Sequence, residues 1–529
     1  MVTSSDSRAS TATWLRNATA EVTSRLPVRA RRSVGRFIDH PESAQRKLLR
    51  RLLRRAADTE WGRRLDFEEI SRAPDIVDAY RVSVPLHDYG DLRDDVQRLR
   101  AGARDVIWPG TFGHFAVSSG TASSGKIIPV SDAMLSSNRD FSMAVGLSYL
   151  QETGNLDFLL GKHLTLPGRI EEDPNFPGTM IGEVSGLQAE HAPLLFSHLL
   201  QAVPNEVAFL PNWERKLRAI AERTVDMDIR SVVMAPTWAL VFFRELIRLR
   251  NDGTGSSVET VGEVWPNLQV FISGGVALSS YRGLLEEVIG LPGLHFLETY
   301  GASEGFFSFQ DRVHDASMLL HLDNGVYFEF VRMDELGSDE PSRYSIGEVE
   351  TDVRYALYVT TCSGLWAYNV GDVVRFTGTA PHRIVVAGRT SEMLDRYGEA
   401  VFGEEMRAAL RSACERTGAH VRDFHVAPRP AELNRLPTHQ WLVEFDRPPE
   451  SEEAFGSALD EYLIDVNRHY QIRREAGAFD RPEVVVLPKG AFYAWLKATK
   501  ERVGGQTKVP RMSEERDVAD GVLAQVTSG

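Results

Sequence analysis

The sequence predicts an α/β protein. Its large N-terminal domain is expected to have mostly parallel sheets plus a β-barrel-like section, and a small mobile α+β C-terminal domain follows. Between about residues 160 and 300, short apolar segments alternate with helical stretches and end in small residues, as strands of a parallel sheet do. From Tyr327 to Phe376 strands follow one another without long helices, which indicates an antiparallel section. After Gly388-Arg389 the chain is more charged and alternates helices with strands again, as in a further domain of about 140 residues.

Composition and charge exclude several classes of protein. With 529 residues the chain is long enough for more than one domain. Its content of 43% hydrophobic and 25% charged residues is typical of a protein with a packed core. A net charge of −14 argues against a nucleic-acid partner, and the lack of an apolar run of about 18 residues argues against a membrane span. Only two cysteines occur, and the N-terminus lacks the apolar core of a signal peptide, so we expect a cytoplasmic protein with no membrane partner.

Changes in composition place the domain boundaries. We expect residues 1–34 to form a poorly ordered or helical N-terminal extension, and residues 35–388 to form the large domain. The segment 389–398 is the predicted hinge, and residues 399–529 are the predicted small domain.

Apolar periodicity predicts the elements in chain order. In the large domain, helices are expected at about 33–57, Ala133–Leu150 and Trp238–Arg250. The strands expected for the parallel sheet are His163–Leu166, Ile229–Met234, Leu268–Ile272 and His295–Thr299. Those expected for the antiparallel section are Tyr327–Val331, Glu348–Glu350, Leu357–Thr361 and Val373–Phe376. The small domain is expected to contain helices Glu404–Thr417 and Glu453–Tyr470 and strands Gln440–Phe445 and Glu483–Leu487.

The stretch from Val117 to Pro129 is rich in serine and glycine and contains one lysine, Lys126. Backbone N–H groups and hydroxyls on such a loop suit the oxygens of a phosphate chain, and the lysine adds positive charge. A flexible Gly/Ser turn is the simpler alternative, but apolar segments frame this loop on both sides. Gly120 to Lys126 also fits the P-loop spacing. The next residue is Ile127 rather than the Ser or Thr that would hold magnesium, so a P-loop NTPase remains only a rival interpretation.

The segment Gly301-Ala302-Ser303-Glu304-Gly305 follows a predicted strand and permits two functions. It matches the nucleophile elbow of serine hydrolases, with Ser303 as nucleophile. Alternatively, Glu304 at a strand end near phosphates would bind magnesium, with Tyr300 offering a flat face to a nucleotide base. Taken alone, the motif can also be interpreted as a tight turn with an exposed Glu304 and no functional role.

Two later positions carry weaker signals. Asp372 lies in a Gly-Asp turn before a strand, where a fixed carboxylate can hold ribose hydroxyls, although a plain β-turn aspartate is also common. Lys508 follows a Gly pair and precedes Val509-Pro510, so it stands on an extended segment and could neutralise charge on a phosphate or carbonyl oxygen. A solvated basic tail is the alternative for Lys508.

The order of these motifs resembles the acyl-adenylate-forming superfamily. The closer resemblance is to its auxin-responsive Gretchen Hagen family of acyl acid amido synthetases, as a bacterial-type member. It extends from about residue 35 to about residue 512. The segments that carry it are Ala57-Asp58-Thr59-Glu60-Trp61-Gly62, Val84-Pro85-Leu86, Ala235-Pro236-Thr237-Trp238, Phe328-Glu329-Phe330 and Gln506-x-Lys508-x-Pro510-Arg511.

The resemblance implies a two-step ligase. ATP and a small carboxylic acid give an acyl-adenylate, and an amine, usually an amino acid, then displaces AMP to form an amide. It implies ATP and Mg²⁺ as cofactors, with Glu304, Lys508 and Lys126 as catalytic residues and Glu304 as the metal ligand. The implied nucleotide-binding residues are Ser118, Ser119, Gly120, Thr121, Ser124, Gly125, Gly274, Gly275, Val276, Tyr300, Gly301, Ala302, Ser303, Asp372 and Arg389. Among these, the Gly/Ser loop would hold phosphates, Tyr300 would frame the adenine, Asp372 would hold the ribose and Arg389 would sit at the hinge.

The chain departs from the family pattern at two positions. Asn369 stands where the family usually has Arg, and Ala400 follows Gly398-Glu399 where Lys is common. The missing lysine at Ala400 leaves open how the phosphate is held in one half-reaction and which acceptor is used. A thioester-forming ligase using coenzyme A or a carrier protein is therefore the main alternative. A serine hydrolase and a non-catalytic nucleotide-binding protein are the further ones.

Overall fold

The computed structural model describes residues 37–117, 126–191, 200–210, 212–254, 257–275, 278–336, 338, 340–390, 393–394, 396–397, 399, 401–430, 435–475, 478–499 and 509–528. The expected N-terminal extension, 1–34, therefore lies outside the described residues.

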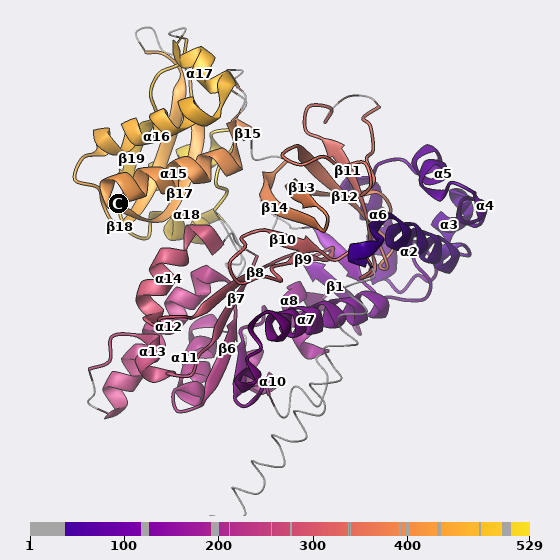
Figure 1. Cartoon of the computed structure of the whole chain (residues 1–529), viewed down its shortest axis with the longest axis horizontal. Coiled ribbons are helices and arrows are strands. Elements are labelled where there is room, and N and C mark those ends of the chain that lie inside the picture. The colour runs from indigo at the N-terminus through magenta and orange to yellow at the C-terminus, as the bar shows by residue number, and fades with distance from the viewer. Residues whose placement is uncertain are drawn as a thin grey trace, which may run out of the picture.

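A ten-stranded sheet, in the order β11-β12-β13-β14-β10-β9-β8-β7-β6-β3, forms the centre of the large domain (Figure 1). One half is parallel and consists of β3 (Lys162–Thr165), β6 (Ile229–Val233), β7 (Val270–Gly274) and β8 (His295–Ala302). The other half is antiparallel and consists of β9 (Gly305–Phe309), β10 (Met318–Leu320), β11 (Val326–Arg332), β12 (Arg354–Thr361), β13 (Tyr368–Thr379) and β14 (His382–Arg389). The predicted α/β class is confirmed.

The antiparallel section is not a closed barrel. Its strands continue the parallel sheet through the antiparallel pair β8–β9, and β11 and β3 are the two sheet edges. The strand expected at Glu348–Glu350 is also wrong. Glu348 lies in a turn, where its carboxylate accepts a hydrogen bond from the backbone N–H of Ser345 at 2.7 Å. A side chain that satisfies a local backbone donor in this way favours a turn over a strand.

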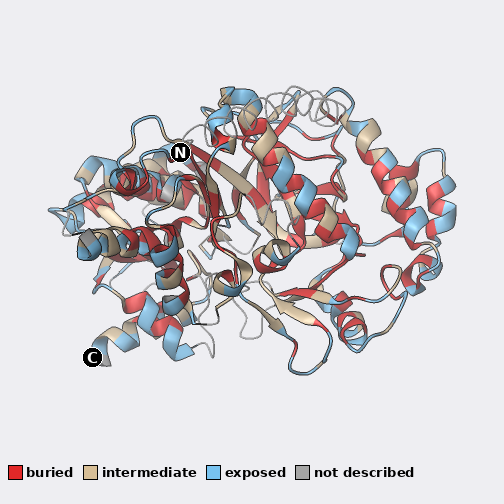
Figure 2. Ribbon diagram, turned by 90° about the horizontal axis from the view of Figure 1, so that it is seen from below, coloured by how far each residue is buried: buried red, intermediate tan, exposed pale blue. Residues whose placement is uncertain are grey.

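Helices cover both faces of the parallel half, as buried parallel strands require. One core joins the strands to α11 (Trp213–Thr224), α12 (Pro236–Thr254), α13 (Val261–Val264) and α14 (Arg282–Ile289). On the other face, Val270, Ile272 and Leu297 pack in a separate core with α7 (Asp132–Thr153). In Figure 2 helices at the surface of the molecule are buried along one side and exposed along the other. Within the described part of the chain, no helix has both the length and the apolar content needed to cross a bilayer.

A second, four-stranded sheet in the order β2-β1-β5-β4 lies beside α7 and the N-terminal helices. Its strands are β1 (His114–Val117), β2 (Ile127–Val130), β4 (Ile170–Glu172) and β5 (Met180–Gly182). The remaining helices of the large domain are α2 (Pro41–Ala56), α3 (Glu60–Arg64), α4 (Phe67–Arg72), α5 (Ile76–Ser83), α6 (Tyr89–Arg100), α8 (Val184–Glu190) and α10 (Asn205–Ala208), with short 3-10 turns at Leu156–Leu159 and Leu278–Ser280.

The C-terminal part is built on a three-stranded sheet of β17 (His420–Arg429), β18 (Thr438–Arg447) and β19 (Glu483–Leu487). Its helices are α15 (Gly403–Thr417), α16 (Glu452–Val466), α17 (Arg468–Glu475), α18 (Ala491–Thr499) and α19 (Asp517–Ser528), and β15 (Met393–Leu394) pairs with β16 (Val401–Phe402). The helix expected at Glu453–Tyr470 is two helices. Asn467 separates them and caps the second by accepting a hydrogen bond from the N–H of Tyr470 at 2.8 Å.

Ion pairs and hydrogen bonds join the C-terminal part to the large domain. Arg354 pairs with Glu405 at 3.0 Å and Arg375 pairs with Glu404 at 3.1 Å, so strands β12 and β13 contact the start of α15. Arg511 donates to the hydroxyl of Tyr281 at 3.1 Å, beside α14. In Figure 1 the orange and yellow C-terminal part correspondingly lies above the pink helices α11, α12 and α14.

Candidate active site

A cavity of about 3250 Å³ opens at the carboxyl ends of the parallel strands. Leu166, Ala235, Gly275 and Ala302, which end or follow β3, β6, β7 and β8, all line it. Residues of the C-terminal part, Arg511 among them, line its other side. Open α/β sheets bind their ligands at this edge, so the cavity is the candidate active site.

Three predicted site residues meet on one wall of this cavity. The hydroxyl of Tyr300 donates to one carboxylate oxygen of Asp372 at 2.7 Å, and Nε of Arg389 pairs with the other at 3.0 Å. Strand register explains the second contact, because Asp372 on β13 lies directly opposite Arg389 on β14. Burial and the charge of Asp372 raise the pKa of Tyr300 well above its usual value, so the hydroxyl stays protonated and remains a donor.

Glu304 lies in the turn between β8 and β9 and is only 4% exposed. Burial raises the pKa of its carboxyl group to about 7, and the neighbouring charge of Asp372 acts in the same direction. Lys126 opposes this rise, so the lysine lies close enough to favour the ionised form. Nζ of Lys126 also lies 5.7 Å from the ring centroid of Tyr368. Glu304, Lys126 and the Tyr300–Asp372–Arg389 group therefore share one electrostatic environment.

The turn at Ser303 is not a nucleophile elbow. Gly301 pairs with Phe306 and Ala302 with Gly305 in an antiparallel hairpin, whereas the elbow requires a strand followed by a helix. The serine hydrolase interpretation is therefore wrong in its structural premise. Gly301 is needed for close packing, since a Cβ there would lie 2.3 Å from a ring carbon of Phe306.

The P-loop interpretation is also wrong. In P-loop proteins the loop leads into a helix, but Lys126 leads into strand β2, which pairs antiparallel with β1. The loop residues Ser118, Ser119, Gly120, Thr121, Ser124 and Gly125 lie outside the described residues, as do Val276 and Lys508.

Gly274 ends strand β7, and a Cβ on it would lie 2.9 Å from the hydroxyl oxygen of Thr299. Gly275 has a φ of +78°, in the left-handed region that favours glycine. Both glycines line the cavity and leave the backbone open to it.

Three residues close to these groups were not predicted as site residues. Tyr368 is fully buried at the start of β13, and burial and the charge of Glu304 raise its pKa. Its position four residues before Asp372 could have identified it as a site residue. Tyr89 accepts a hydrogen bond from the N–H of Ile127 at 3.0 Å, which no sequence signal indicated. Asn369 accepts a hydrogen bond from the N–H of Gly371 at 2.9 Å, so this departure from the family pattern stabilises the turn before Asp372.

Solved structures of similar fold were found. A "GH3.15 acyl acid amido synthetase" matches with a TM-score of 0.74 and 18% identity, covering 91% of this chain and 93% of that one. A "2-Hydroxyisobutyryl-CoA Ligase" in the postadenylation state matches with a TM-score of 0.56 and 14% identity, covering 92% of both chains. At these identities the matches establish that this chain shares the fold of these two proteins.

Curated relatives align along most of the chain. Indole-3-acetic acid-amido synthetase GH3.3 of Arabidopsis thaliana is 24% identical, covering 92% of this chain and 91% of its own length. Indole-3-acetic acid-amido synthetase GH3.8 of Oryza sativa subsp. indica is 26% identical over 76% of each chain.

Family models match in three consecutive blocks. The GH3 family N-terminal domain matches residues 30–166 and 141–293, the central domain matches 319–389, and the C-terminal domain matches 404–517. The matched blocks follow the family's own order and occupy most of the sequence. The chain therefore belongs to the GH3 family, as its motifs predicted.

Proposed function

We propose that this protein is an ATP-dependent ligase that adenylates a small carboxylic acid and transfers the acyl group to an amine, most simply an amino acid. In the first step an oxygen of the acid attacks the α-phosphorus of ATP, and the bond to pyrophosphate breaks. In the second step the amine nitrogen attacks the acyl carbon, the bond to AMP breaks and the nitrogen loses a proton. Family membership supports this reaction, as does the clustering of Lys126, Tyr300, Glu304, Asp372 and Arg389 at the strand ends.

The contacts of Asp372 suit it to the ribose. A carboxylate has about four lone-pair directions, and Tyr300 and Arg389 use one on each oxygen. The remaining ones can accept hydrogen bonds from two ribose hydroxyls. We assign the adenine to Tyr300, Gly301, Ala302, Ser303, Gly274, Gly275 and Val276, and the phosphates to residues 118–126.

Glu304 fits the magnesium ion that this reaction requires. Its carboxyl group is buried and its pKa is raised to about 7, so a cation beside it offsets the cost of keeping it charged. Mg²⁺ usually binds one or two carboxylates together with substrate phosphates and water, so a single glutamate suffices. When bound, the ion would neutralise charge on the phosphates of ATP.

The other charged residues act on the substrates directly. Lys126 would bind the phosphates, and Lys508 would meet charge on the adenylate. Arg389 ends β14, immediately before the proposed hinge 389–398, so residues 399–529 can reorient between the two steps and bring different groups to one site. We place the reaction in the cytoplasm, which supplies ATP.

Pyrophosphate release tests this proposal. The protein is incubated with ATP, Mg²⁺ and a panel of carboxylic acids, with amino acids and coenzyme A added separately. We expect acid-dependent release, with an amide as product when an amino acid is present. Thioester formation with no amide would instead identify the protein as a coenzyme A ligase. ATP binding without pyrophosphate release across the panel would favour a binding protein.

Two substitutions test the site itself. Lys126→Ala and Glu304→Ala should each lower acid-dependent pyrophosphate release by about 10²-fold or more, because each removes charge stabilisation in a buried site. Release at the wild-type rate from both variants would refute the site assignment. Ser303→Ala tests the rejected nucleophile role, since loss of its hydroxyl should abolish activity only in a serine hydrolase.

A further inference from the structure

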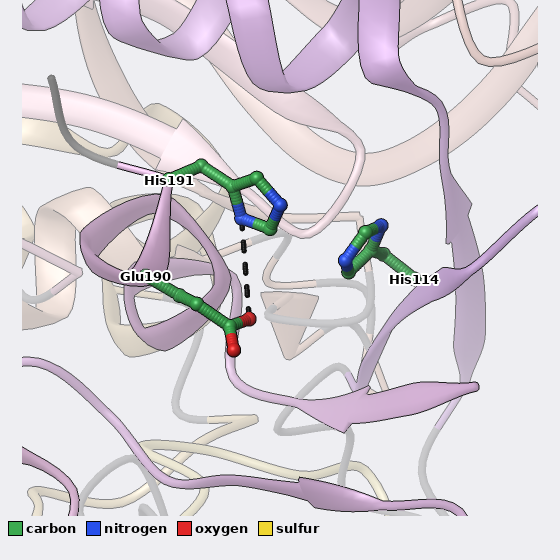
Figure 3. Close-up of side chains that lie close together, drawn as sticks. All are labelled: His114, Glu190 and His191. Carbon is green, nitrogen blue, oxygen red and sulfur yellow. Dashed lines mark ion pairs between the residues drawn. The ribbon is translucent and has the colours of Figure 1, made fainter. Parts of the chain in front are cut away.

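A second group of polar side chains lies outside the residues that line the active-site cavity. His114 is at the start of β1, and Glu190 and His191 are at the end of α8. One ligand atom from each of the three lies within 4.8 Å of the others. Figure 3 shows the two imidazole rings and the carboxylate converging on one space.

The distances are close to those of a metal site. Zn²⁺ binds imidazole nitrogen and carboxylate oxygen at about 2.0–2.2 Å, so ligand atoms around one ion stand about 3–4 Å apart. The side chains of Glu190 and His191 are 35% and 37% exposed, so small rotations can close the remaining gap. The rings of His114 and His191 already lie edge to face, with centroids 4.6 Å apart.

Each of the two histidines has a ring nitrogen that can bind a metal. Nδ1 of His191 lies 2.9 Å from the carbonyl oxygen of Leu187, and a proton there would leave Nε2 with its lone pair free. Nδ1 of His114 is buried and has no hydrogen-bond partner among the described residues. A buried polar atom of this kind requires a partner, and a metal ion would supply one.

The charges around His114 also favour an ion. Glu190 and Asp132 contribute negative charge nearby. The group therefore combines two imidazoles with a carboxylate.

We propose that His114, Glu190 and His191 bind a divalent transition-metal ion, with Zn²⁺ as the preferred ion. Two imidazoles and one carboxylate form a three-ligand set typical of zinc, with a fourth position left for water. The ion would fix the end of α8 to β1. Since α8 lines the active-site cavity and β1 leads into the predicted phosphate loop, the metal would hold these two walls together.

Equilibrium dialysis of the untagged full-length protein against Zn²⁺ alone tests the site. We expect one ion per chain, with His114→Gln and His191→Gln each weakening binding by at least about 100-fold, as loss of a direct ligand should exceed the effect of an outer-shell change. His314→Gln is the matched control. His314 is exposed between β9 and β10, so this variant should bind Zn²⁺ normally.

X-ray absorption at the zinc edge tests the same site in the wild-type protein alone. We expect a first shell with two imidazoles, and we expect Zn²⁺ to raise the melting temperature of the wild type and the His314 variant only. No stoichiometric binding, an all-water shell or equal binding by all variants would overturn the proposal. Because none of these measurements uses the ligase reaction, the outcome is independent of the proposed function.

Discussion

At the scale of single residues, Glu304 shows how a functional group can oppose stability. Its carboxyl group would ionise near pH 4.5 in the unfolded chain, but burial raises its pKa to about 7 in the folded protein. The unfolded state therefore loses this proton first, and stability falls as the pH rises from about 4.5 through about 7. The full effect is roughly 3 kcal/mol in the nucleotide-free protein.

Glu304→Gln should consequently stabilise the nucleotide-free protein at about pH 8 and change little at about pH 5, because glutamine carries no charge to bury. Urea unfolding at the two pH values measures this difference. Equal effects at both would contradict the raised pKa.

The same carboxyl group should make nucleotide binding depend on pH. Below about pH 7 Glu304 is protonated, so binding of Mg²⁺–ATP must displace a proton and should weaken by up to tenfold per pH unit. Dialysis with ATP and Mg²⁺ over about pH 5.5 to 8 should reveal this slope in the wild type. It should be absent in Glu304→Gln, and an identical slope in both proteins would mean that another group titrates.

Asp372 offers a second prediction at this scale. Asp372→Ala should raise the KM for ATP at least about tenfold, since hydrogen bonds to a charged group contribute about 1.5–3 kcal/mol each. The KM for the acid should change much less. Tyr300→Phe keeps the ring and removes only the hydroxyl that donates to Asp372, so its effect on ATP should be smaller. Equal losses for ATP and acid in Asp372→Ala would refute the ribose assignment.

At the scale of elements, the sequence predicted the parallel strands well because buried runs such as Val270–Ile272 are apolar and are followed within two residues by small residues and glycine. It did not reveal that β8 pairs antiparallel with β9, because the partner of a strand is decided by contacts distant in sequence. Strand β17 was missed, since His420–Arg429 mixes charged residues and proline with its apolar ones. Because strand pairing depends on contacts distant in sequence, the contact of Asp372 with Arg389 could not be predicted without the register of β13 with β14.

The β8–β9 hairpin can be tested through Gly301. A Cβ at this position would lie 2.3 Å from Phe306, whose ring stacks on Phe141 with centroids 5.2 Å apart and so has little room to move. Gly301→Ala should cost about 1–3 kcal/mol of unfolding free energy and lower adenylation, because it distorts the turn that carries Glu304. Gly253→Ala, in α12 with open space around it, is the control and should be neutral or stabilising. A fully stable and active Gly301→Ala would show that the turn can relax.

At the scale of the whole molecule, the sequence predicted a division near residue 389, and a mobile C-terminal domain remains our proposal. It could not predict the ion pairs Arg354–Glu405 and Arg375–Glu404, which join residues about 30 or more positions apart. Each arginine side chain is 26% exposed, so each pair should contribute no more than about 1 kcal/mol. Ion pairs of that strength can favour one orientation of the C-terminal part relative to the large domain without locking it in place.

The double variant Arg354→Met/Arg375→Met should therefore shift the balance of orientations by up to about 30-fold, as two contributions of about 1 kcal/mol allow. Small-angle scattering would measure the change in shape, and the ratio of pyrophosphate exchange to amide formation would measure its effect on the two steps. High salt should produce part of the same change in the wild type. Arg248→Met is the control, because Arg248 pairs with Glu245 within α12. A double variant that scatters and reacts like the wild type would show that these pairs do not bias the orientation.

Arg389 connects the proposed hinge to the carboxylate that we assign to the ribose. It is the last residue of β14, and its guanidinium group is also the partner of Asp372. A rearrangement of the residues that follow it should therefore alter its contact with the carboxylate that we assign to the ribose. Ribose binding and reorientation of the C-terminal domain would then both depend on this one contact. Substitutions in 389–398 should therefore alter the affinity for ATP as well as the rate of acyl transfer.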